Sequence, residues 1–121
     1  MNKAEALHSF WSSFYLPAYD EYTVPDKPSY PYITYEVSEG ELDYPVVMTA
    51  SLWYQGTSWS GAENKANEIA RKIRKMNAIR LDNGFLAITA GSPFAQRRDD
   101  PNDDRIRRIL INITAEYFTE Y

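Results

Sequence analysis

The sequence contains no cysteine and only one histidine, His8. The lack of cysteine excludes disulfides, a thiolate nucleophile and cysteine-ligated zinc, and it fits a protein made in a reducing cytoplasm. One histidine cannot build a multi-histidine metal site. Because His8 lies off the apolar stripe of its segment, we expect it to be an exposed polar residue.

Long apolar runs and nucleotide-binding or metal-binding motifs are also missing from the sequence. Crossing a bilayer as a helix requires about 18 or more consecutive apolar residues, and secretion requires a basic and then apolar leader. We therefore expect a soluble protein that is not exported and has no membrane partner. The sequence has no Gly-rich phosphate loop and no helical metal motif. It predicts no enzyme activity, no catalytic or metal-binding residues and no cofactor.

The chain has 121 residues, of which 44% are hydrophobic and 25% charged, which is typical of one globular domain over residues 1–121. Aromatic residues make up 15% of it, including ten tyrosines. Such residues favour strands but are also enriched at protein interfaces, and both readings stay open. The net charge of −4 argues against general affinity for nucleic acid, although it leaves room for a local basic patch.

Two segments have the periodicity of amphipathic helices. Residues 2 to about 15 carry apolar side chains at three- and four-residue spacing and end before Pro17. The second helix is predicted from Ser60 to about Met76, with Ser60 and Glu63 in a capping-box pattern. The cluster of basic residues at the end of this second helix indicates a solvated face more than a phosphate-binding patch.

Strand patterns fill most of the remaining sequence. Residues 32–37 and 46–54 alternate in polarity and are joined by a short connection, which predicts an antiparallel hairpin. Asn83-Gly84 is suited to a type I′ turn between two further strands. The sequence thus predicts an α+β fold with the order α-β-β-α-β-β. Its antiparallel or mixed sheet would carry the two main helices on one face.

The last third of the chain combines a charged segment with a cleanly alternating strand. Ile109, Ile111 and Ile113 share one face of that strand and are predicted core residues. Residues 92–104 before it are predicted to be a long loop, and loops of that length are usually functional or disordered. We interpret the segment from Phe94 to Arg108 as a projecting, hairpin-like contact surface for protein. Its candidate contact residues are Phe94, Arg97, Arg98, Asp99, Asp100, Asp103, Asp104, Arg105 and Arg107.

Other readings of the charged segment are weaker. Its aspartates could offer oxygen ligands to a hard cation, but they lack the spacing of a calcium-binding loop, and arginines on both sides would neutralise them. The arginines could meet nucleic acid, but the intervening aspartates favour complementary contacts with protein. A solvated loop without a partner is the remaining alternative.

A second candidate contact lies between Pro17 and Pro31, where prolines alternate with tyrosines. Proline favours extended backbone here over helix or central strand. Such an arm either packs on its own domain or reaches a neighbouring subunit. In the second case Tyr22 and Tyr30 are the candidate contact residues.

Four short pieces in order carry a family resemblance: Pro31–Tyr35, Leu52–Tyr54, Ser58-Trp59 and Pro93–Gln96. Together they resemble the tail terminator family (tail completion, or tail-to-head joining, proteins) of siphophages and related prophages. The resemblance extends over nearly the whole chain and rests on the order and spacing of the pieces, since none is diagnostic alone.

The resemblance implies an α+β subunit of a hexameric ring. Such a ring caps the finished tail tube, binds the tube protein and the head connector protein, and lets DNA pass as cargo. It would be located in the tail or neck of the virion, and in the host cytoplasm during assembly. Two alternatives are a head-side neck stopper, adaptor or minor capsid protein, and a small nucleic-acid-binding α+β domain.

Overall fold

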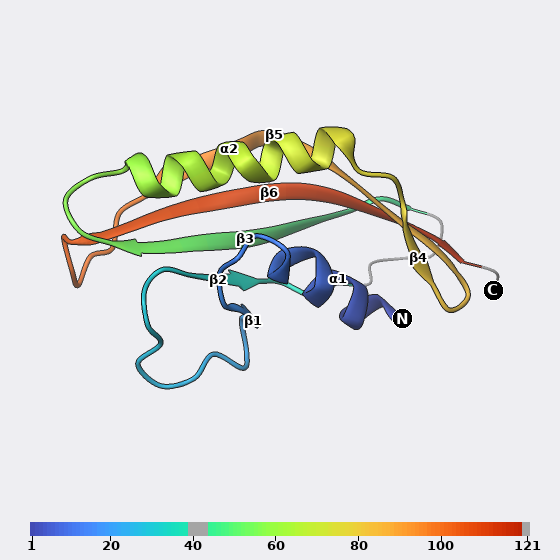
Figure 1. Ribbon diagram of the computed structural model, residues 1–121, viewed down its shortest axis with the longest axis horizontal. Helices are drawn as coiled ribbons and strands as arrows, with labels where there is room; N and C mark the ends of the chain where they lie inside the picture. Colours follow the sequence, from blue (N-terminus) through green and yellow to red (C-terminus); the bar gives the residue numbers. More distant parts are fainter. Residues whose placement is uncertain (39–43, 120–121) are drawn as a thin grey trace.

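The computed structural model describes residues 1–38 and 44–119, and it has an α+β fold built on one mixed sheet (Figure 1). The strand order in the sheet is β1-β2-β3-β6-β5-β4. All neighbouring strands are antiparallel except β1 and β2, which run parallel. The elements in chain order are α1 (Lys3–Ser12), β1 (Ala18–Asp20), β2 (Tyr32–Tyr35), β3 (Val46–Gln55), α2 (Ser60–Lys75), β4 (Ile79–Leu81), β5 (Gly84–Arg98) and β6 (Ile106–Thr119).

The alternating strand predicted at the end of the chain is confirmed as β6, the centre of the sheet. It pairs with β3 on one side and with β5 on the other. Ile109, Ile111 and Ile113 are at most 1% exposed. The predicted antiparallel pairing of the strands that begin at Tyr32 and Val46 is confirmed as well.

The two helices pack differently from the simple layer that the sequence suggested. Figure 1 shows α2 lying lengthwise over the long strands, and it contacts β3, β5 and β6. Helix α1 instead contacts β1 and β4, the opposite edges of the sheet. A flat sheet could not present both edges to one short helix, so the sheet curls around α1. Leu7 and Trp11 thereby join the same core cluster as Ile69 and Ile73 of α2.

Two details of the predicted elements were wrong. The short strand β1 was not expected, because a three-residue strand carries almost no periodic signal, whereas the short strand predicted before the Asn83-Gly84 turn is confirmed as β4. The β4–β5 turn has Asp82 and Asn83 at its centre, since Leu81 pairs with Gly84. A type I′ turn needs positive φ at both central residues, and neither has it.

The capping box predicted for α2 is absent there, and a capping box is found on α1 instead. Ser60 is the first residue of α2, whose N-cap is Trp59 and has no side-chain cap hydrogen bond. The capping box lies on α1 instead, where Asn2 Oδ1 accepts from the Glu5 amide at 2.8 Å and Glu5 Oε1 accepts from the Asn2 amide at 3.0 Å. Glu63 was expected to cap α2, but its Oε1 instead accepts from Arg97 Nε at 2.8 Å.

Candidate functional site

The predicted loop of residues 92–104 is mostly strand. β5 continues to Arg98 and stays paired with β6, with a register shift between Ala90 and Ala95, so only residues 99–105 connect the two strands. This long β5–β6 hairpin extends past the core to a charged end next to the start of α2 (Figure 1). We call residues 99–105 the hairpin tip.

The candidate contact residues of the hairpin divide into two groups. Phe94 packs partly buried against the core, and the guanidinium groups of Arg97 and Arg107 lie over the Trp59 ring at 4.8 and 5.5 Å. Buried Arg107 Nε has no hydrogen-bond partner among the described residues, and the Trp59 ring supplies its electrostatic contact instead. These three side chains therefore attach the hairpin to its own domain.

The second group lies at the hairpin tip and its base. Arg98, Asp99, Asp104 and Arg105 are exposed, while Asp100 and Asp103 are half-buried. Among the described residues, none of the four aspartates forms an ion pair. Two of them shape the turn, because Asp100 Oδ1 accepts from the Asn102 amide at 2.8 Å and Asp103 Oδ1 accepts from the Arg105 amide at 2.9 Å.

The two tyrosines of the proline-rich arm have different surroundings. Tyr22 is 88% exposed. Tyr30 is half-buried, with its ring centroid 5.3 Å from that of Tyr32. Tyr19 also contacts Tyr32, with ring centroids 6.1 Å apart, so Tyr19 and Tyr30 pack on the chain's own sheet while Tyr22 is exposed.

Opposite the helices, the sheet has a face that neither α1 nor α2 covers, here called the open face. Val47, Thr49 and Trp53 of β3 point to it, alternating with core residues. At one end it is apolar, because the cross-strand neighbours Phe85 and Phe118 are 48% and 51% exposed. At the other end it contains a pocket that the sequence did not single out.

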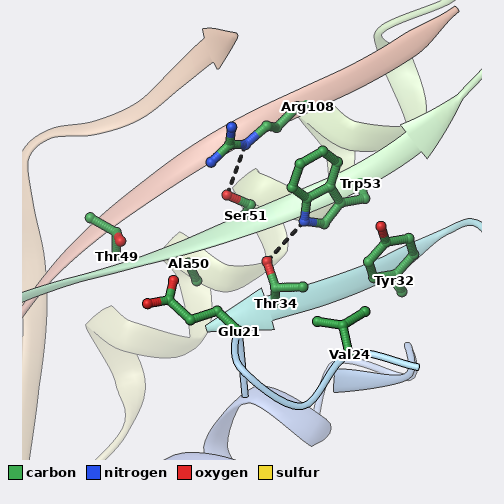
Figure 2. Close-up of a pocket in the computed structure, with 9 residues that line it drawn as sticks. All are labelled: Glu21, Val24, Tyr32, Thr34, Thr49, Ala50, Ser51, Trp53 and Arg108. Atoms are coloured by element: carbon green, nitrogen blue, oxygen red, sulfur yellow. Dashed lines mark hydrogen bonds between the residues drawn. The ribbon is translucent and has the colours of Figure 1, made fainter. Parts of the chain in front are cut away.

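Figure 2 shows this pocket, a cavity of about 220 Å³ between β2, β3 and β6 and the start of the arm. Tyr32 and Trp53 stack with an interplanar angle of 11° and centroids 5.9 Å apart. Trp53 Nε1 donates to Thr34 Oγ1 at 2.8 Å, which fixes the indole in place. The lining residues are Glu21, Val24, Tyr32, Thr34, Thr49, Ala50, Ser51, Trp53 and Arg108.

Arg108 is the basic group of this pocket, and Glu21 is its acidic group. Its guanidinium lies 4.6 Å from the Trp53 ring centroid, and its Nε donates to Ser51 Oγ at 3.0 Å. Burial, with a further contribution from nearby Arg98, lowers the pKa of Arg108 below its usual value. Ser51 is the one buried polar residue of the described chain, and Arg108 satisfies its hydroxyl.

Ionisation of Tyr32 is expected to destabilise the folded protein in alkaline solution. Burial and the neighbouring Tyr30 raise the pKa of Tyr32 from 10.0 to about 12. A raised pKa in the folded state gives stability that is complete below pH 10 and is lost as the pH rises toward 12. Between about pH 9 and about pH 11, the free energy of unfolding of the wild type should fall by about 1 kcal/mol more than that of Tyr32→Phe. Urea unfolding at the two pH values measures both. Equal losses in the two proteins would contradict this assignment.

Some site types find no support in the described chain. In residues 1–38 and 44–119, no group of three or more histidine, aspartate or glutamate side chains lies close enough to hold a metal. Within the same residues, no helix is both long and apolar enough to cross a membrane. Compared with known proteins, the chain matches no protein-family model and no curated protein.

Proposed function

We propose that this chain is a ring-forming tail terminator of a long-tailed phage or prophage. In that role it would cap the tail tube, bind the head connector, and let DNA pass through as cargo. It would act in the virion neck after assembly in the host cytoplasm. The family resemblance in the sequence suggests this role, and the geometry of the subunit is compatible with it.

One observation carries the proposal: the hairpin tip and the open face are two different exposed surfaces on one small subunit. A ring requires a head-to-tail contact in which one surface of each copy meets a different surface of the next. The tip has aspartates without ion-pair partners, and the open face has aromatic and basic side chains. Complementary charges of this kind fix register and partner choice.

The proposal is tested by removing the gene from the phage genome that encodes it. We expect particles with tails of uncontrolled length and no attached heads, and normal particles when the intact gene is supplied in trans. Electron microscopy of the lysates measures both features. Tails of normal length that fail to join heads would indicate a head-side stopper instead, and unchanged infectious particles would contradict any neck role.

A further inference from the structure

Two arginines face each other across neighbouring strands, and one of them, Arg108, lines the pocket. Arg98 of β5 pairs directly with Arg108 of β6, so both side chains point to the open face. Like charges at such positions destabilise a sheet. Among the described residues, neither arginine forms an ion pair; Arg98 only donates to Gln96 Oε1 at 3.1 Å.

The donors of Arg108 are only partly used. Its Nε is bonded to Ser51, and in Figure 2 no other drawn residue is joined to the guanidinium. Among the described residues its two terminal nitrogens have no hydrogen-bond partner. The Arg108 guanidinium is half-buried, bonded at Nε, stacked on Trp53 and repelled by Arg98. Its two terminal nitrogens can therefore donate to a planar anion.

We infer that this pocket binds a glutamate or aspartate side chain from an acidic segment of a partner protein. The carboxylate would bridge Arg98 and Arg108, and its methylene groups would occupy the cavity beside Trp53. This would relieve the repulsion between the arginines and satisfy the free donors. The pocket would do so whether or not the protein closes a ring.

The surroundings of the pocket favour a carboxylate over a nucleic-acid phosphate. Glu21 lines the opposite wall, and Asp100 lies near enough to act electrostatically on Arg108. A nucleic-acid strand would bring several phosphates toward these carboxylates and toward exposed Asp99. A cavity of about 220 Å³ suits one side chain, and a single carboxylate brings only one negative charge toward Glu21 and Asp100.

The test is an NMR titration of the whole protein, observing the side-chain N–H signals of Trp53 Nε1 and Arg108 Nε. The probes are N-acetyl-glutamate N-methylamide and its uncharged glutamine counterpart. We expect saturable shifts at both signals with the glutamate probe and none with the glutamine probe. Equal responses to the two probes would overturn the inference.

Three variants locate the site. Arg98→Gln and Arg108→Gln should each weaken binding about 10-fold or more, because each removes charge-assisted hydrogen bonds. Arg98 is exposed, so its replacement tests the site without disturbing packing. Arg80→Gln, an equal loss of charge at an exposed position of edge strand β4, should leave the affinity unchanged. Equal affinities in all three variants would rule out the arginine pair.

Of two further outcomes, the first would assign the pocket to a different occupant and overturn the inference, and the second would identify the partner. In the first, a short single-stranded DNA oligonucleotide shifts the same signals at lower concentration than the glutamate probe. In the second, the signals shift with protein concentration alone and this dependence is lost in an Asp99→Lys, Asp104→Lys variant, which would support the inference and identify the acidic segment as the hairpin tip of a second copy of the chain.

Discussion

Replacing Trp11 with alanine is expected to destabilise the protein by about 3–5 kcal/mol, the usual cost of truncating a fully buried large aromatic side chain. Trp11 is 1% exposed, and its ring packs edge-on against Phe10 with centroids 4.8 Å apart. It lies on the helix around which the sheet curls. Small domains are stable by only about 5–15 kcal/mol, so much of the folded population would be lost at moderate denaturant.

Urea unfolding followed by circular dichroism measures this cost. Ser9→Ala on the exposed side of the same helix is the control and should change stability by less than about 0.5 kcal/mol. Trp11→Phe should lie between the control and Trp11→Ala. A cost below about 1 kcal/mol for Trp11→Ala would mean that α1 does not hold the two edges of the sheet together.

Reversing charge at the hairpin tip is expected to weaken subunit or tube contact by about 10-fold or more, because juxtaposed like charges at an interface cost several kcal/mol. The variant is Asp99→Lys with Asp104→Lys. Both residues are exposed, and neither side chain has a hydrogen-bond partner among the described residues. The fold should therefore be retained, which thermal unfolding can check.

A matched control makes the same charge change elsewhere, with Asp26→Lys and Glu36→Lys. Sedimentation velocity measures association of the protein, and complementation of a gene deletion measures tail completion. We expect the tip variant to fail in at least one assay while the control performs as wild type. If both variants behave alike, the hairpin tip is not a contact surface.

The sequence predicted the parts of the fold that have an apolar period. The isoleucines of β6 alternate strictly, and α2 has a clear apolar stripe, so both were placed correctly. For the far part of β5 the sequence predicts a loop, because this part of the strand extends past the core and has no apolar face. Gln96 and Arg98 face the open side there and Arg97 faces Trp59, so polar residues occupy both faces and no alternation remains.

The pocket was missed for a different reason. Ser51, Trp53 and Thr34 were recognisable as outward residues of their strands, but their meeting depends on register between strands. Trp53 lies between Tyr32 on β2 and Arg108 on β6 only because of the pairing in this sheet. A useful signal was a large aromatic beside a serine on the polar side of a strand, since such a side chain needs a partner to cover it.

Native mass spectrometry combined with negative-stain electron microscopy shows directly whether the chain assembles as a ring. The protein is measured alone and after co-expression with the tail tube protein of the same phage. We expect a closed six-fold ring with six times the 14.0 kDa mass of one chain, in at least one of the two samples. Monomers or two-fold dimers in both samples would contradict it.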